Sequence, residues 1–140
     1  MKTFKVKAAI ANYEACAVFI EDQLTAAGFD SKSTIKVLTA CEEIIVNVMN
    51  YAYTDGEGDL VIAFDDGADF IKITFIDGGK PFNPFEEPDF DVNQSVDERG
   101  IGGLGILMVK KLMDEVHYEY KDQQNVLTIM KKLSAPKENI

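Results

Sequence analysis

Three short segments carry the residue types that could do chemistry in this 140-residue chain. In the segment from Glu43 to Tyr53 (EIIVNVMNYAY), an acid, an amide and a phenol follow each other at every fourth position: Glu43, Asn47 and Tyr51. At about 3.6 residues per turn, this spacing places them on one face of a helix. The stripe either faces solvent or lines a cleft, and the modest helix propensity of Asn favours the cleft.

The second segment, from Asp77 to Pro84 (DGGKPFNP), follows a predicted strand at 70–77. Alternate residues of this strand share a core-facing row: Ile71, Ile73, Phe75 and Asp77. A carboxylate in that row needs hydrogen-bond donors, and the amine of a bound base is one such donor. The alternative is a turn aspartate that opens the bend of Gly78 and Gly79. Gly79 would let the backbone approach a flat ligand, and Pro81 fixes the chain direction that follows.

The third segment, from Arg99 to Ile106 (RGIGGLGI), precedes a predicted helix at 104–113. A glycine-rich helix start offers unpaired backbone N–H groups and the positive end of the helix dipole, which suit a phosphate. The segment lacks the lysine of a P-loop and the preceding strand of a dinucleotide fingerprint. The alternative interpretation is a flexible hinge.

Together and in this order, the three segments resemble the N, G1 and G2 boxes of the ATPase domain shared by histidine kinases, Hsp90, gyrase B and MutL. The short form DGGKPFNP and the run RGIGGLGILMVKKLMDEVHYEY are most similar to its small stand-alone branch. That branch is the anti-sigma factor serine/threonine kinase family of bacteria, a stand-alone histidine-kinase-like (GHKL) ATPase domain. The resemblance covers nearly the whole chain, from about Phe4 to Leu133.

The resemblance implies that Glu43 is the catalytic general base and that Asn47 coordinates a Mg²⁺ ion that bridges the phosphates of ATP. Asp77 would accept a hydrogen bond from the adenine amino group, and the late glycines would surround the triphosphate. The full set of implied ATP-binding residues is Asn47, Asn50, Tyr51, Asp77, Gly79, Pro81, Phe82, Arg99, Gly100, Gly102, Gly103, Leu104, Gly105 and Asn125.

Two positions depart from the family pattern. Tyr51 stands where many relatives carry His, so a phosphate contact there would come from a phenol. Asn125 stands where the family places a Thr near adenine, and an amide can contact the base through water.

Around these segments, the pattern predicts helices at 12–27, 31–51 and 104–113 and strands at 2–8, 58–64, 70–77, 115–121 and 125–133. This order predicts an α/β (α+β) two-layer sandwich. The resemblance makes it a Bergerat-type ATP-binding fold, with a mixed, largely antiparallel sheet covered by helices on one face. We expect a single domain at 1–134 and a loose tail at 135–140. The acidic stretch within 78–103 is either a solvated loop or a lid over ATP.

Composition narrows the function classes. The net charge of -10 argues against binding nucleic acid, which needs neutralising Lys and Arg. Neither a signal peptide nor a membrane span is predicted, and Cys16 and Cys41 have no metal-site spacing, so we expect a cytoplasmic protein with reduced core thiols. His117, the only histidine, alternates with apolar strand residues, and we expect it to be exposed and not to be a phosphoacceptor.

The resulting hypothesis is an ATP- and Mg²⁺-dependent serine/threonine protein kinase. By resemblance, it would phosphorylate a serine of a small anti-anti-sigma (STAS-like) protein and so regulate transcription. A sigma factor would be a second partner, and homodimerisation stays open. Two alternatives remain at this point: a nucleotide-switched partner-binding module without kinase activity, and an ATP hydrolase in which Glu43 activates water.

Overall fold

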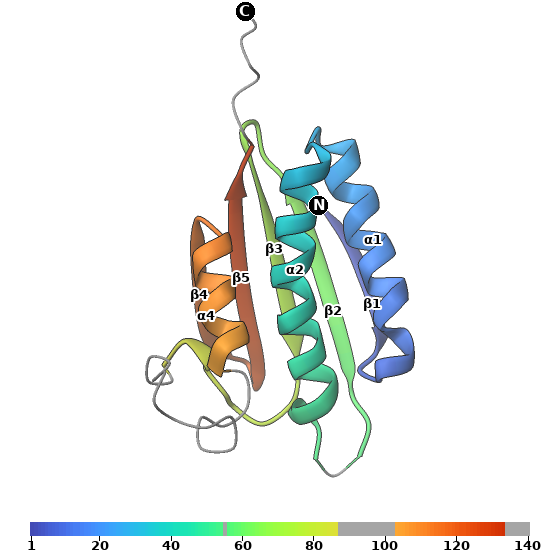
Figure 1. The fold of residues 1–140 in the computed structure, drawn as a ribbon. Coiled ribbons are helices and arrows are strands. Elements are labelled where there is room, and N and C mark those ends of the chain that lie inside the picture. The colour runs from blue at the N-terminus through green and yellow to red at the C-terminus, as the bar shows by residue number, and fades with distance from the viewer. Residues whose placement is uncertain (55, 87–102, 134–140) are drawn as a thin grey trace, which may run out of the picture.

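One five-stranded sheet forms the back of the molecule. The structure is a computed structural model, and it describes residues 1–54, 56–86 and 103–133. The strands are β1 (Lys2–Lys7), β2 (Asp59–Asp66), β3 (Phe70–Asp77), β4 (Glu115–Lys121) and β5 (Gln124–Lys132). Their order in the sheet is β1-β2-β3-β5-β4, and all four neighbouring pairs are antiparallel (Figure 1). The central strand, β3, therefore pairs with β5, which comes from a distant part of the sequence, and this pairing places Asp77 opposite Asn125.

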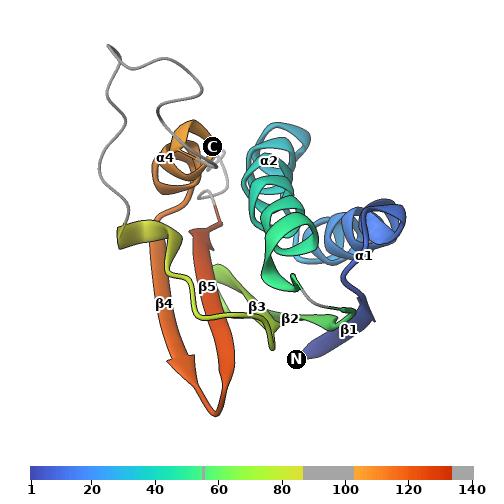
Figure 2. The same ribbon diagram turned by 90° about the horizontal axis from the view of Figure 1, so that it is seen from below.

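The described helices cover one face of this sheet. They are α1 (Tyr13–Ala26), α2 (Ser31–Asn47) and α4 (Gly103–Leu112), with 3-10 turns at Ile10–Asn12 and Pro84–Glu86. Viewed along the layers, α1 and α2 lie over the β1 to β3 side of the sheet, and α4 lies over β5 and β4 (Figure 2). No described helix covers the opposite face. The predicted two-layer α+β sandwich is confirmed, although its sheet has only antiparallel pairings.

The turn between α1 and α2 is set by two local signals. Gly28 has a φ of 97°, a left-handed conformation that favours glycine after a helix end. Phe29 N–H then donates to the carbonyl oxygen of Leu24 at 3.1 Å. The N-cap of α2 is Asp30, whose Oδ1 accepts from Ser33 N–H at 2.8 Å. A serine at 31 or 33 also has the chemistry of a cap, but here Ser33 supplies the capped N–H group.

The core lies between α1, α2, α4 and the inner face of the sheet. Its fully buried side chains come from every layer and include Ile20, Leu24, Val37, Ile45, Ile62, Ile73, Phe75, Val109 and Ile129. Burial of such side chains contributes about 1.5–3 kcal/mol each relative to exposure. The alternation predicted for 70–77 is confirmed, because Ile71, Ile73, Phe75 and Asp77 are all buried.

Both cysteines lie in the core, and the histidine lies outside it. Cys16 and Cys41 are free and buried, and burial raises the pKa of both thiols. His117 is exposed on β4, as predicted. No helix in the described part of the chain is long and apolar enough to span a membrane. The predicted tail at 135–140 and most of the predicted lid, residues 87–102, lie outside the described residues.

The largest difference from the predicted elements is at the end of α2. The predicted helix at 31–51 is α-helical only to Asn47, and Val48–Ala52 form a π turn. The carbonyl oxygen of Ala52 accepts from Lys80 N–H at 3.2 Å. That oxygen also lies so close to Gly79 that a Cβ there would be only 2.2 Å away. This contact with the chain after β3 is tertiary and is not visible in the local sequence pattern.

Candidate nucleotide-binding site

The first two segments and the described part of the third meet at one end of the molecule. The π turn after α2, the start of α4 and the loop of residues 78–83, here called the β3 loop, lie together at the lower end of Figure 1. Strand β3 brings Asp77 to this end, and α2 brings Glu43 and Asn47. The order of these elements in the sheet and helix layers therefore assembles residues from 43 to 125 in one place.

Glu43 lies directly against the first turns of α4. A Cβ placed on Gly105 would be 1.7 Å from Glu43 Oε1 and 2.2 Å from Glu43 Cδ. Only a glycine leaves room for the carboxylate in this position. Glu43 is partly exposed, and its side chain forms no hydrogen bond or ion pair with any other residue of the described ranges. A carboxylate in this position could act as a general base toward a hydroxyl group held at the start of α4.

Asn47, Asn50 and Tyr51 continue from Glu43 along α2 and its π turn. Asn47 is the last residue of α2 and is partly buried, whereas Asn50 and Tyr51 are exposed. Four residues of an α-helix turn slightly past a full circle, and four residues of the wider π turn stop short of one. The two deviations offset each other, so Tyr51 stays on the side of the helix that carries Glu43. π turns of this kind are frequent at functional sites.

Asp77 is the buried acid of the site. Asp77 is only 6% exposed. Its Oδ1 accepts hydrogen bonds from Gly79 N–H at 2.8 Å and from Asn125 Nδ2 at 2.9 Å. Burial raises the pKa of Asp77, and these two hydrogen bonds partly oppose the rise. No described residue donates to Oδ2, so this oxygen can accept a hydrogen bond from a ligand amine.

Asn125 uses its whole amide to hold the β3 loop. Nδ2 donates to Asp77 Oδ1 and, at 2.9 Å, to the carbonyl oxygen of Lys80. Oδ1 accepts from Phe82 N–H at 3.1 Å and from the Tyr118 hydroxyl. An amide offers two hydrogens and two lone pairs, and all four are used within the protein here. The structure therefore shows Asn125 as a support of Asp77 and the β3 loop, and its contact with adenine through water stays a prediction.

The glycine at 79 has a packing reason as well as the expected ligand-facing one. The direction in which its side chain would point is filled by Ala52 at the end of the π turn. Pro81 and Phe82 follow in the same loop, and both are exposed, Phe82 to 47%. The loop thus presents an apolar ring to solvent next to the buried acid.

The third segment is only partly described. Arg99, Gly100 and Gly102 lie outside the described residues, while Gly103 and Leu104 begin α4 and Gly105 touches Glu43. An open hollow of about 250 Å³ lies beside the β3 loop and is lined by residues 52–54, 56–57 and 78–80. Glu43, Asn47 and Asp77 do not line this hollow.

Two tyrosines of the site were missed by sequence reasoning. The Tyr118 hydroxyl contacts Asn125 and Phe82 N–H, and the Tyr53 hydroxyl contacts Gly78 N–H. Tyr53 closes the first segment, which is the only signal that could have suggested it. Nothing in the local pattern around Tyr118 points to the loop, because the contact depends on the pairing of β4 with β5.

In the described part of the chain, helices cover one sheet face, a helix-borne acid meets the glycine-containing start of α4, and a buried aspartate ends β3, a combination typical of an ATP-binding domain of the histidine-kinase-like class. The model of the histidine kinase-like ATPase domain family matches residues 6–131, and the chain belongs to this family. Within it, the predicted branch, the anti-sigma factor serine/threonine kinases, is confirmed by relatives that are serine-protein kinases.

One such relative is the serine-protein kinase RsbW of Oceanobacillus iheyensis. It is 31% identical over 116 residues, which are 79% of this chain and 72% of the relative. RsbW of Bacillus mycoides is 26% identical over 103 residues, 71% of this chain and 63% of the relative. The match therefore spans less than two thirds of the second relative's length. The predicted enzyme class, a protein serine/threonine kinase, is supported at the level of the family.

Two solved structures share the fold. The RsbU and RsbW domains of Rv1364c from Mycobacterium tuberculosis match with a TM-score of 0.61 and 16% identity, covering 95% of this chain and 33% of that one. The catalytic domain of histidine kinase ThkA matches with a TM-score of 0.57 and 12% identity, covering 95% of this chain and 99% of that one. At these identities, the likeness concerns the fold alone.

Proposed function

We propose that this chain binds ATP with Mg²⁺ and transfers the γ-phosphoryl group to a serine of a small anti-anti-sigma (STAS-like) protein, thereby regulating transcription. The observation that carries the proposal is the contact of Glu43 with Gly105. It puts a carboxylate that has no hydrogen-bond partner among the described residues beside a glycine-rich helix start. A proton acceptor next to a phosphate-binding helix end is the minimum that phosphoryl transfer to a hydroxyl requires.

The adenine end of the site is Asp77. An adenine amino group would donate to Oδ2, because Oδ1 is already held by Gly79 and Asn125. A guanine base presents a carbonyl oxygen at the same position, and a carboxylate cannot donate to it. Asp77 thereby supports selection of ATP over GTP.

The phosphate end is built from Asn47 and the start of α4. The Asn47 side chain has no hydrogen-bond partner among the described residues, and its amide oxygen suits Mg²⁺, which is commonly held by one or two protein oxygens together with substrate phosphates. Mg²⁺, when bound, neutralises charge on the transferring phosphoryl group. This matters for a chain with a net charge of -10, which otherwise repels a triphosphate. Gly100, Gly102, Gly103 and Gly105, with Arg99 and Leu104, are proposed to line the triphosphate.

Glu43 is proposed as the general base. It would accept the proton of the substrate serine hydroxyl as the oxygen attacks the γ-phosphorus and the bond to the β,γ-bridging oxygen breaks. Its position one turn before Asn47 on α2 would keep the base next to the residue that would hold Mg²⁺. Positioning and charge neutralisation supply the rest of the rate enhancement.

The partner side of the proposal rests on the family. A STAS-like substrate is proposed, with a sigma factor as a second, alternative partner and a homodimer as the assembly. Residues 78–103 are proposed to act as a lid within a single domain at 1–134, and the cytoplasm is proposed as the location. With an acidic net charge, nucleic acid is not proposed as a ligand.

The test is a phosphoryl-transfer assay with γ-labelled ATP, Mg²⁺ and a STAS-domain protein from the same genome. Glu43→Gln is expected to bind ATP normally and to lose about 10²–10⁴-fold in transfer rate, which is the usual contribution of a general base. The matched control is Glu42→Gln, because Glu42 is the adjacent, exposed acid on the same helix. Capture of the partner without transfer would favour the switch module, and phosphate release without any partner would favour the hydrolase.

A further inference from the structure

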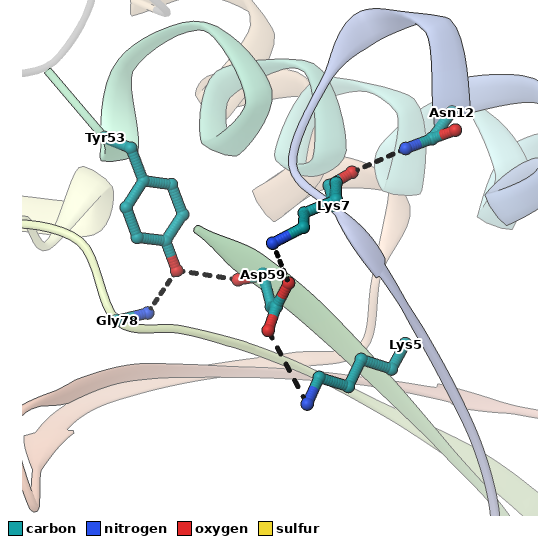
Figure 3. A network of polar contacts seen from close by, with 6 residues as sticks. All are labelled: Lys5, Lys7, Asn12, Tyr53, Asp59 and Gly78. Carbon is teal, nitrogen blue, oxygen red and sulfur yellow. Dashed lines mark hydrogen bonds and ion pairs between the residues drawn. The ribbon is translucent and has the colours of Figure 1, made fainter. Parts of the chain in front are cut away.

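Tyr53 sits between the end of the π turn and two backbone segments of the sheet. Its hydroxyl donates to the carbonyl oxygen of Asp59, at the start of β2, at 2.7 Å. The same oxygen accepts from Gly78 N–H, the first residue of the β3 loop, at 2.6 Å (Figure 3). One phenol thus joins the end of the first motif to the beginning of the second.

The ring of Tyr53 is also fixed, by close packing on Gly58. A Cβ on Gly58 would lie 2.0 Å from Tyr53 Cε1, so the ring rests on a residue without a side chain. Burial raises the pKa of Tyr53, which keeps the phenol protonated and able to donate. The carboxylate of Asp59 in turn meets Lys5 and Lys7 of β1 at 3.5 and 3.7 Å (Figure 3). These two pairs are exposed, so the hydroxyl contacts are the firmer part of the network.

The β3 loop is therefore held by hydrogen bonds from two sides. On one side, Asn125 binds the Asp77 carboxylate, Lys80 O and Phe82 N–H. On the other side, Tyr53 binds Gly78 N–H, between Asp77 and Gly79. The direction of the Asp77 carboxylate depends on the peptides that follow it, because Gly79 N–H donates to its Oδ1.

We infer that Tyr53 is a positioning residue for nucleotide selection: its hydroxyl fixes the peptide after Asp77 and so aims the free carboxylate oxygen at the amine of an adenine base. This inference rests on the proposed ATP site. Tyr53 touches no reacting atom. Its effect reaches the ligand through Gly78 and Asp77, so it acts on binding and on the choice of base and not on the chemical step.

The test is Tyr53→Phe, which keeps the ring over Gly58 and removes only the hydroxyl. In the nucleotide-free variant, the Gly78 amide is expected to exchange its hydrogen faster, as measured by NMR. The affinity for MgATP is expected to fall by about two- to twelvefold, since a hydrogen bond contributes about 0.5–1.5 kcal/mol. Because MgGTP gains nothing from Asp77, the preference for ATP over GTP should shrink by a similar factor. The KM for ATP should rise while kcat stays unchanged.

The matched control is Tyr120→Phe. Tyr120 is 44% exposed on β4, and its hydroxyl makes no hydrogen bond with a described residue. This variant should leave both affinities and the Gly78 exchange rate unchanged. Should Tyr53→Phe fail to fold, Gly58→Ala replaces it, because the added methyl group displaces the ring while the hydroxyl is kept.

An unchanged ratio of ATP to GTP affinity in Tyr53→Phe would overturn the inference, whatever happens to the thermal midpoint, because a purely structural role lowers stability without altering the choice of base. If the unmutated protein binds neither nucleotide, the proposed function fails first. That result is distinguishable, because it precedes any comparison of variants.

Discussion

Asn125 donates a hydrogen bond to the buried carboxylate of Asp77, and the two residues are direct partners in the antiparallel pairing of β5 with β3. The acid that would recognise a base is therefore supported from the neighbouring strand. The remaining amide atoms of Asn125 bind the chain from Lys80 to Phe82. One side chain thus couples the aim of Asp77 to the course of the β3 loop.

Removing this support should cost stability as well as affinity. Asn125→Ala removes the amide that binds Asp77 Oδ1, Lys80 O and Phe82 N–H, and it leaves Asp77 Oδ1 with Gly79 N–H as its remaining described donor. Loss of a hydrogen bond to a charged group costs about 1.5–3 kcal/mol, so the free energy of unfolding in urea should fall by about 2–4 kcal/mol. Gln124→Ala, at the exposed neighbouring position, is the control and should change it by less than about 0.5 kcal/mol. Equal effects of the two substitutions would refute the supporting role of Asn125.

Gly105→Ala should lower activity without lowering stability. Alanine in place of glycine in a helix stabilises it by up to about 1 kcal/mol. The new methyl group, however, takes the place of the Glu43 carboxylate, which can move away because it ends a flexible side chain. We expect an unchanged or higher thermal midpoint together with at least about a tenfold loss of phosphoryl transfer. Met108→Ala, on the exposed face of the same helix, is the control for transfer. Full activity of Gly105→Ala would show that the observed position of Glu43 is not needed for transfer.

The raised pKa of Asp77 gives a stability change with a definite sign. Its pKa is raised above the ordinary value of 3.8 by burial, so between 3.8 and the raised value the folded protein binds more protons at this site than the unfolded chain. The contribution of Asp77 to stability therefore falls as the pH rises through this window. Asp77→Asn should remove this component, so the stability of the variant relative to the unmutated protein should increase from pH 3.8 upward. Chemical denaturation at a series of pH values measures it, and a difference that stays flat with pH would contradict the burial argument.

Much of the fold was predictable because hydrophobic periodicity is local. The strands at 70–77 and 115–121 occur with the predicted bounds, and the burial of Asp77 followed from the alternation before it. The end of α2 was not predictable, because the π turn is held by the contacts of Ala52 with Gly79 and Lys80, which come from another part of the chain. Helix propensity depends on the local sequence alone, so it cannot predict such a contact.

The candidate site likewise has one part that the sequence predicts and one part that only the tertiary structure shows. The acid, the amide and the glycines were visible as spaced residue types, and the family resemblance supplied their roles. The closeness of Glu43 to Gly105 and the use of Asn125 as a support depend on how α2 meets α4 and how β3 meets β5. Tyr53 and Tyr118 went unnoticed because a tyrosine after a helix or within a strand is ordinary until its hydroxyl is seen to bind a loop.

Whether Asp77 belongs to a nucleotide site is decided by a thermal-unfolding titration with ATP, with and without Mg²⁺, of the unmutated protein and of Asp77→Asn. Ligand at about 100 times its dissociation constant adds about 2.7 kcal/mol, which raises the midpoint of a domain of this size by roughly 8 °C. The account predicts an increase that requires Mg²⁺, exceeds the one seen with GTP and shrinks strongly in Asp77→Asn. An unchanged midpoint with every nucleotide, or an equal increase in the variant, would contradict the account of this site.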